Sequence, residues 1–246
     1  MRKEDIENQE HRYLNRSLWS NLQSLKSTVS FMQTGAHPDD ETSRLLAKLS
    51  LDEGYYVSYV NAVRGQGGQN SIGPERDDNL GALRTYELLK AMSVLRVDIG
   101  WLANSRNNSI IDFGLSKSAE ETFEFWDKNY TIQRMIRIVR AYKPDIIIPT
   151  FLDVEGQHGH HRAVTKATIE AFDNSNDPEI FPDDNFGPWK ISQIFLPAWS
   201  GGGGSYDDEE DPPKATHFIQ VGNYNHIFGG TYNQIGEWSR SYHATQ

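Results

Sequence analysis

The sequence predicts an α/β fold, in which a mainly parallel sheet carries helices on both faces. Short apolar stretches rich in β-branched residues alternate with stretches of helical periodicity, and the 246 residues suffice for one large domain with a full core. In addition, polar clusters that contain His and Asp directly follow two of the apolar stretches. Sites in open α/β sheets gather at the carboxyl ends of the strands, so these clusters are the candidate functional residues.

In the first half of the chain, strand and helix signals follow one another. Residues 28–36 (TVSFMQTGA) are strand-like, and a helix is predicted from about Asp40, where leucines recur on one face. Residues 55–63 (YYVSYVNAV) form the next predicted strand, and residues 74–95 form a helix opened by a proline and early acids. Residues 97–103 (VDIGWLA) give a weaker third strand signal. This order predicts repeated βα units.

The second half continues the alternation. Residues 130–143 carry apolar side chains at helical spacing up to Pro144, which ends the helix. Residues 145–151 (DIIIPTF) are typical of a strand buried on both faces, and a helix is predicted over residues 161–172. A further short strand is predicted at residues 215–221 (ATHFIQV), between loop-like stretches.

Composition excludes several classes of function. The net charge is −10 and no long block of Lys and Arg occurs, so no nucleic-acid partner is expected. The chain has no cysteine, which excludes disulfides, thiolate metal sites and a Cys nucleophile but fits any compartment. No stretch approaches the ~20 apolar residues of a membrane span, and the polar N-terminus is unlike a signal peptide. The sequence therefore predicts a soluble chain and leaves its compartment and oligomeric state open.

One large domain is expected at residues 28–246, preceded by a polar, helical extension at residues 1–27. The GGGGS stretch at residues 201–205 is interpreted as a loop within the domain, since globular sequence continues on both sides. A helix-like stretch, residues 231–246, runs to the last residue without a helix-ending signal. That pattern is typical of a piece of a longer protein.

The two polar clusters are GAHPDDE at residues 35–41 and GQHGHHRAV at residues 156–164. Each lies between a predicted strand and a predicted helix, so both reach the same edge of the sheet. His37, Asp40 and His161 can then form a His-Asp-His set with an open fourth position, as in catalytic zinc sites. The same ligand set suits Fe²⁺ or Co²⁺.

The remaining polar residues of the clusters have roles to match. Asp39, one residue from a ligand, is placed to accept the proton of the reacting water, and His158 could face the other side of the reacting carbon. Glu41 is interpreted as a charge at the start of the following helix. An alternative without any site is that all three acids and Pro38 simply begin that helix.

These motifs resemble those of the PIG-L (LmbE-like) family of zinc-dependent N-acetylglucosamine de-N-acetylases. Further stretches resemble the longer branch of that family, so the similarity covers nearly the whole chain from about residue 28: RGQGGQNSIGPE, LGALRTYELLKA, DFGLSKSAEETFEFW and SRSYHATQ. The resemblance implies a Rossmann-like fold, a zinc ion and a catalytic domain that removes an acetyl group from an N-acetylated amino sugar or glycoconjugate. It also implies the metal ligands, general base and assisting histidine already named.

The resemblance adds two residues and brings three departures. Arg84 and Asp112 match positions that contact the sugar in some members, although Arg84 could equally form an ion pair on a helix and Asp112 could cap a turn. His160 stands where many members have an acid that could orient His158, and we expect it at the surface or behind the ligands. Gly156 replaces a tyrosine used near the oxyanion, and Gln66 a common glutamate.

Other functions remain to be weighed. A catalytically silent sugar-binding module of the same fold would need no base, so Asp39 and His158 argue against it. A His-Asp-His set also occurs in non-haem iron oxygenases, although on β-barrels. A dinucleotide loop is disfavoured because GQGGQN has Asn70 where the motif needs glycine. The sequence therefore favours a hydrolytic mechanism in which a metal-activated water attacks the acetamide, Asp39 acts as base and protonated His158 assists the oxyanion.

Overall fold

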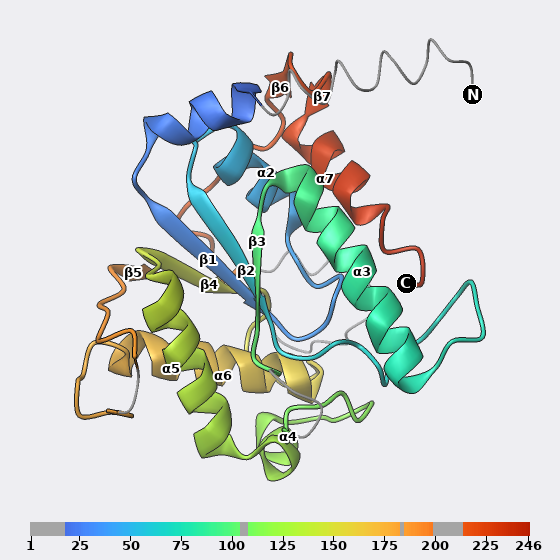
Figure 1. Cartoon of the computed structure of the whole chain (residues 1–246), viewed down its shortest axis with the longest axis vertical. Coiled ribbons are helices and arrows are strands. Elements are labelled where there is room, and N and C mark those ends of the chain that lie inside the picture. The colour runs from blue at the N-terminus through green and yellow to red at the C-terminus, as the bar shows by residue number, and fades with distance from the viewer. Residues whose placement is uncertain (1–17, 104–107, 183–184, 199–213) are drawn as a thin grey trace.

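The computed structural model describes residues 18–103, 108–182, 185–198 and 214–246. Within them a five-stranded sheet has the strand order β3-β2-β1-β4-β5, and every neighbouring pair is parallel. The strands are β1 (Ser30–Gly35), β2 (Tyr56–Asn61), β3 (Asp98–Trp101), β4 (Ile146–Pro149) and β5 (Gln193–Ile194). The predicted parallel α/β fold is confirmed (Figure 1).

Strand β1 is the point at which the strand order reverses. It pairs with β2 on one side, with Gly35 opposite Asn61, and with β4 on the other, with Thr34 opposite Pro149. In open parallel sheets a crevice forms beyond the carboxyl ends of the strands at such a reversal. The topology therefore brings the chain that follows β1 next to the chain that follows β4, and these are the two polar clusters.

Three helices cover one face of the sheet (Figure 1): α2 (Ser43–Leu51), α3 (Asp77–Leu95) and α7 (Tyr232–Arg240). Buried side chains of these helices and of β1 and β2 form one apolar cluster, in which Leu46, Tyr59 and Met92 are fully buried. Helix α7 begins with a capping box, in which Thr231 and Gln234 bond reciprocally. The last helix of the chain is thus packed onto the first βα unit.

The opposite face carries α4 (Ala119–Trp126), α5 (Lys128–Tyr142) and α6 (Gly159–Asn174). Their apolar side chains pack with those of the sheet in a second cluster that includes Met32, Trp126 and Ile136. The periodic stretch at residues 130–143 is the core of α5, as predicted. Two hydrophobic layers therefore enclose the sheet and fix the strand ends that carry the site.

Six details of the sequence prediction need correction. The first helix begins at Ser43 instead of Asp40, and residues 215–221 form no strand. The final helix ends at Arg240, and turns follow it. Helix α4 and strand β5 were not predicted, nor was the short hairpin of β6 (Tyr224–Asn225) and β7 (Gly230–Thr231).

Some predictions fall partly outside the described residues. Most of the N-terminal extension and the GGGGS loop lie there, whereas residues 18–23 are helical and a 3-10 turn follows (Ser24–Lys26). The boundary at residue 28 stays a prediction. Within the described residues, every helix is too short or too polar to cross a membrane.

Candidate active site

The turn after β1 positions the first two candidate ligands. The Asp40 carboxylate oxygen Oδ2 accepts hydrogen bonds from the backbone N–H groups of Ala36, at 3.0 Å, and His37, at 2.7 Å. The backbone N–H of Asp40 donates back to the carbonyl of His37. This closed turn holds both side chains at the end of the strand, with Asp40 pointing towards the chain that follows β4.

The start of α6 positions the third candidate ligand. An added Cβ at Gly159 would lie 2.3 Å from the Ser116 hydroxyl, so glycine allows the start of α6 to pack closely on the loop that precedes α4. His161 follows in the first turn, where Phe151 stacks on its ring with centroids 4.2 Å apart. The His161 Nδ1 lies 3.4 Å from the side-chain oxygen Oε1 of Gln157. If Nδ1 carries the hydrogen, the Nε2 lone pair is directed at the site.

Three donor atoms from these two elements converge. His37 Nδ1 lies 3.2 Å from His161 Nε2 and 3.5 Å from Asp40 Oδ2, and His161 Nε2 lies 3.3 Å from Asp40 Oδ2. Two ligands of a tetrahedral zinc ion, each about 2.05 Å from the metal, lie about 3.3 Å apart. The spacing, the donor types and the burial of the group therefore fit a divalent ion.

Electrostatics favour a positive charge at the same point. Burial would raise the pKa of Asp40, but the charge of His161 and hydrogen bonds from His161 and His37 hold it well below its usual range. Burial lowers the pKa of His37, but the hydrogen bond and the charge of Asp40 outweigh it, so the pKa is raised. Protons here occupy the lone pairs that a metal needs, so metal and protons compete for one site.

Asp39 has an unusual backbone and an unusual pKa. Its φ is 101°, in the left-handed region that residues other than glycine rarely adopt. Its carboxylate is 22% exposed and accepts a hydrogen bond from Arg84 Nη2 at 2.8 Å. Burial and the negative charge of Asp40 raise the pKa of Asp39 to about 6, although Arg84, His37 and His243 lower it. A carboxylate with this pKa can both accept and release a proton near pH 7.

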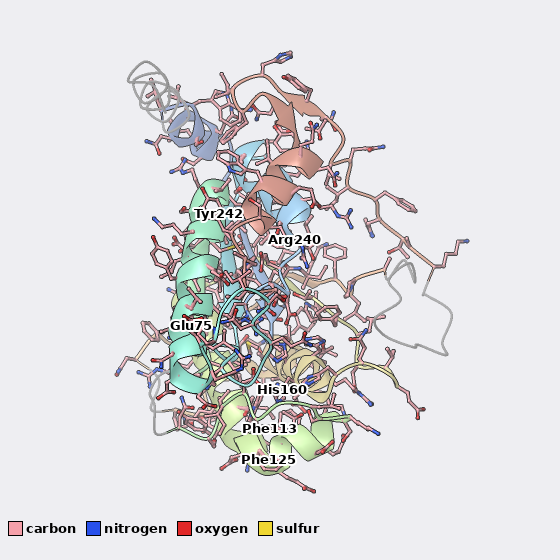
Figure 2. The ribbon with its side chains drawn as sticks, turned by 90° about the vertical axis from the view of Figure 1, so that its right-hand side faces the viewer. Glu75, Phe113, Phe125, His160, Arg240 and Tyr242 are labelled. Atoms are coloured by element: carbon pink, nitrogen blue, oxygen red, sulfur yellow. The ribbon has the colours of Figure 1, made fainter. Side chains whose placement is uncertain are left out.

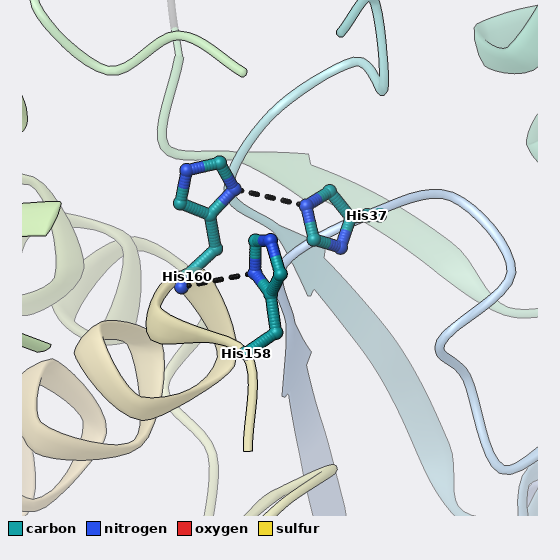
Figure 3. A group of neighbouring side chains, drawn as sticks. All are labelled: His37, His158 and His160. Carbon is teal, nitrogen blue, oxygen red and sulfur yellow. Dashed lines mark hydrogen bonds between the residues drawn. The ribbon is translucent and has the colours of Figure 1, made fainter. Parts of the chain in front are cut away.

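His158 caps the start of α6. Its Nδ1 accepts a hydrogen bond from the backbone N–H of His160 at 3.2 Å, which leaves the hydrogen of the neutral ring on Nε2 (Figure 3). The ring lies beside those of His37 and His161, with centroids 5.3 and 5.4 Å away. Burial and the charges of His37 and His161 lower the pKa of His158 to about 4. The ring is therefore neutral at pH 7, whereas the sequence-based mechanism used its protonated form.

His160 is fully buried behind His37. Its Nδ1 lies 3.0 Å from His37 Nε2 (Figure 3). The other ring nitrogen of His37, Nδ1, is the one close to His161 and Asp40. Burial, and then the charge of His37, lower the pKa of His160, so it is neutral and its Nδ1 can accept from His37. Aromatic rings of Phe113 and Trp126 enclose it, and Figure 2 shows Phe113 next to it. Of the two predicted places for His160, the surface is excluded, and the place behind the metal ligands stays a prediction, because His160 also belongs to a second possible donor group with His37 and His158.

The two residues expected to contact a sugar have protein partners. Arg84 is 3% exposed and donates to the carbonyls of Gly65 and Pro38 as well as to Asp39. Asp112 is 8% exposed, and its carboxylate accepts from the backbone N–H of Gly114, which is a turn-capping bond. The turn cap considered for Asp112 therefore exists. Arg84 does form an ion pair, but a buried one with Asp39 in the turn after β1 and not one on a helix surface, and the sugar contacts stay predictions.

Glu41 does not charge the start of a helix, so that prediction is wrong. The first turn of α2 holds no acid, and the Glu41 side chain is buried. One carboxylate oxygen lies 2.8 Å from His243 Nε2 and the other accepts from the backbone N–H of Asp39 at 3.2 Å. Sequence reasoning also missed Gln157, although its position one helical turn before His161 was a signal. No local signal connects Glu41 with His243.

A comparison with models of protein families identifies the family of this chain. A model of the family described as PIG-L, GlcNAc-PI de-N-acetylase, matches residues 32–172, which is more than half of the chain. The chain belongs to the PIG-L family. The matched region contains both polar clusters, so the residues that converge at the end of β1 lie within it.

Known proteins similar to this PIG-L chain include deacetylases of N-acetylated sugars. The 1D-myo-inositol 2-acetamido-2-deoxy-alpha-D-glucopyranoside deacetylase 1 of Frankia casuarinae is 30% identical over 183 residues, and the match covers 67% of this chain and 57% of that protein. This chain thus spans little more than half the length of that relative. The N,N'-diacetylchitobiose deacetylase from Pyrococcus horikoshii has a TM-score of 0.57 at 19% identity, over 100% of this chain and 80% of that one.

The fold is shared with another chemistry as well. GalB, the 4-carboxy-2-hydroxymuconate hydratase from Pseudomonas putida KT2440, has a TM-score of 0.51 at 13% identity, over 68% of this chain and 64% of that one. Likeness at such identities shows the fold alone. The reaction has to be argued from the site.

Proposed function

We propose that this chain is a metal-dependent deacetylase, which hydrolyses the acetamide group of an N-acetylated amino sugar or glycoconjugate. The observation that carries the proposal is the convergence of three donor atoms, 3.2 to 3.5 Å apart, together with the raised pKa of Asp39, which precedes the donor Asp40 in the chain. Hydrolysis of an amide by water needs both components, an electrophilic centre and a base. Family membership and the names of the similar proteins support the amide of an amino sugar as the substrate.

His37, Asp40 and His161 would hold the metal. Two imidazoles and one carboxylate with an open position suit zinc, and Fe²⁺ or Co²⁺ could substitute. When bound, such an ion supplies Lewis acidity, which polarises an amide oxygen and makes water more acidic. Gln157 would orient His161 and His160 would orient His37, each through the ring nitrogen that does not ligate.

Asp39 acts as the general base. Its carboxylate lies in the turn between His37 and Asp40, is partly exposed, and is ionised near neutral pH because its pKa is about 6. It takes a proton from the attacking water as the water oxygen bonds to the amide carbon. The same carboxyl group then holds the proton that the departing nitrogen needs. Arg84 orients this carboxylate through its hydrogen bond to Oδ1.

His158 assists as a neutral donor. Because its Nδ1 is occupied by the backbone N–H of His160, its Nε2–H is the group available to the substrate. A hydrogen bond from Nε2–H to the amide oxygen strengthens as negative charge develops on that oxygen. This role needs no protonated imidazole and agrees with a pKa of about 4. Gly156 offers no side-chain donor of the kind that the tyrosine of other members provides.

A substrate panel tests the proposal. The purified chain would be incubated with N-acetylglucosamine, N,N'-diacetylchitobiose and an N-acetylglucosaminyl inositol, and released acetate would be measured with and without a chelator. We expect acetate from at least one substrate, loss of activity after chelation, and recovery on adding zinc. Tight binding of several sugars without turnover would instead favour a silent sugar-binding module.

A further inference from the structure

The end of the chain lies against the turn that carries Asp39. Helix α7 packs on α2, and an added Cβ at Gly236 would lie 2.6 Å from the backbone nitrogen of Arg44, so only glycine allows this approach. Ser239 donates a buried hydrogen bond to the carbonyl of Ala91 in α3. The residues that follow, 240–246, are called the C-terminal segment below. They are brought next to the start of α2 by these contacts.

Two contacts connect the C-terminal segment to the backbone of Asp39. Arg240 Nη1 donates to the Asp39 carbonyl at 3.2 Å. His243 Nε2 lies 2.8 Å from Glu41 Oε1, and Glu41 Oε2 accepts the backbone N–H of Asp39 at 3.2 Å. A carboxylate oxygen can only accept, so His243 is the donor to Glu41. Both peptide groups that flank the Asp39 side chain are therefore held from the same segment, one directly and one through Glu41.

The second contact is a buried one. The side chains of His243 and Glu41 are 2% and 0% exposed, and the pair is 202 residues apart in the sequence. A buried, charge-assisted hydrogen bond fixes geometry more firmly than an exposed one. Arg240, by contrast, is exposed (Figure 2). The two contacts can thus be removed separately, one from the core and one from the surface.

The conformation of Asp39 needs such support. A φ of 101° in a residue with a Cβ is unfavourable by about 1–3 kcal/mol and persists where the surroundings determine it. The two flanking peptide groups set this angle. The C-terminal segment also shares with Asp39 a cavity of about 310 Å³, and none of His37, Asp40 and His161 lines it. The segment therefore reaches Asp39 from a side that the metal donors do not occupy.

We propose that His243, acting through Glu41, and Arg240 are positioning residues that hold Asp39 in the backbone conformation from which its carboxylate reaches the reacting water. The inference rests on the proposed function, because it assigns the two residues to the action of Asp39 as base. A C-terminal segment far from the metal ligands in sequence would then determine the rate of the chemical step. It would leave metal binding and substrate affinity unchanged.

His243→Leu removes the donor to Glu41, and His243→Gln places an amide N–H where Nε2 lies. Arg240→Gln removes the surface contact, and Ser241→Ala is the matched control in the same segment. On the best substrate of the panel, we expect kcat to fall about 10–100-fold in His243→Leu and several-fold in Arg240→Gln, with KM and metal content unchanged. His243→Gln should restore much of the loss, and Ser241→Ala should match the wild type.

The decisive measurement combines each change with Asp39→Asn. If the segment acts through Asp39, His243→Leu and Arg240→Gln should lower kcat no further in that background. Multiplicative losses, or a rise in KM alone, would overturn the inference and leave Asp39 as base. Wild-type turnover in Asp39→Asn itself would overturn the proposed function together with the inference.

A readout that does not depend on activity is hydrogen exchange of the peptide that covers residues 35–41. His243→Leu should speed exchange of the Asp39 amide relative to Ser241→Ala, with and without zinc. Equal exchange in the two variants would contradict the proposed contact. Should His243→Leu fail to fold, Arg240→Gln carries the same kcat test, because its side chain is exposed and its removal leaves the core intact.

Discussion

His37 Nδ1 and His161 Nε2 lie 3.2 Å apart although 124 residues separate them in the sequence. The distance follows from strand order, because β1 and β4 are neighbours and each delivers one histidine beyond its carboxyl end. Two nitrogens at this distance either share a proton or bind one ion. Asp40 Oδ2, at 3.3 and 3.5 Å from the same two atoms, supplies the negative charge that makes either occupant stable.

The first prediction concerns metal content. Protein purified without added metal should contain about one divalent ion per chain, bound by His37, Asp40 and His161. A second group of donors, His37, His158 and His160, also lies close enough to hold an ion, but it shares His37 and offers no carboxylate. Asp40→Asn and His161→Ala should each reduce this content strongly, whereas His226→Ala, at an exposed histidine, should not. Elemental analysis measures the result. Full metal content in both ligand variants would place the ion elsewhere.

The second prediction concerns the residue behind His161. Gln157→Leu removes the acceptor next to His161 Nδ1 and keeps the size of the side chain, so the ring loses its preferred orientation. Zinc affinity should fall about 10–100-fold, the usual effect of removing such a partner. Competition with a chromogenic chelator measures it, and Gln193→Leu on β5 is the control. An unchanged affinity would mean that Phe151 stacking alone orients the ring.

The sequence was sufficient to predict four of the five strands of the sheet and the converging clusters. Strands β1 and β4 appear as apolar runs, and parallel strands necessarily bring their carboxyl ends to one edge. The strand predicted at residues 215–221 is absent for a physical reason. A strand forms only where its backbone pairs with a neighbouring strand. Among the described residues, the segment pairs with no strand, and its Phe218 is 87% exposed.

Contacts that depend on tertiary packing could not be predicted. Arg84 reaches Asp39 across 45 residues and His243 reaches Glu41 across 202, and no periodicity encodes either distance. The positive φ of Asp39 could not be predicted either, because an aspartate does not by itself require this backbone conformation. Roles that arise from the position of one side chain relative to another therefore became visible only in the fold.

The third prediction separates base from ligand. Asp39→Asn is nearly isosteric and removes the proton acceptor, so deacetylation should fall roughly 10²–10⁴-fold, the usual contribution of general acid–base catalysis. Metal content should stay at the wild-type level, in contrast to Asp40→Asn. Initial rates and elemental analysis of the two variants, side by side, measure the contrast. Equal loss of metal from both would identify Asp39 as a ligand.

The fourth prediction concerns the helical layer behind α6. Arg140 is 1% exposed and donates to four backbone carbonyls, those of Ser175, Asp177, Ile180 and Phe181. Arg140→Met fills the same space but leaves the buried Ser175 carbonyl and three partly buried carbonyls without this donor, so the free energy of unfolding should drop by about 3 kcal/mol or more. Urea denaturation measures it, with Arg137→Met at an exposed position of the same helix as control. A change below about 1 kcal/mol would contradict the role of Arg140 in this layer.

The last prediction concerns pH. The base must be ionised, so kcat/KM should rise with pH through the pKa of Asp39, which burial and Asp40 raise to about 6. A bound cation lowers the pKa of a nearby carboxyl group, so the acidic limb of the active enzyme should lie at or below pH 6. Arg84 is one of the charges that hold this pKa down.

Arg84→Gln keeps hydrogen-bond donors near Asp39 and removes the positive charge. The pKa of Asp39 should then rise further, and the acidic limb should move to higher pH, while the plateau at high pH is affected less. The profile of kcat/KM from pH 4.5 to 9, measured on the best substrate with saturating zinc, tests the direction of the shift. A limb that moves to lower pH, or a loss that is equal at every pH, would mean that Arg84 acts on the substrate instead of on Asp39.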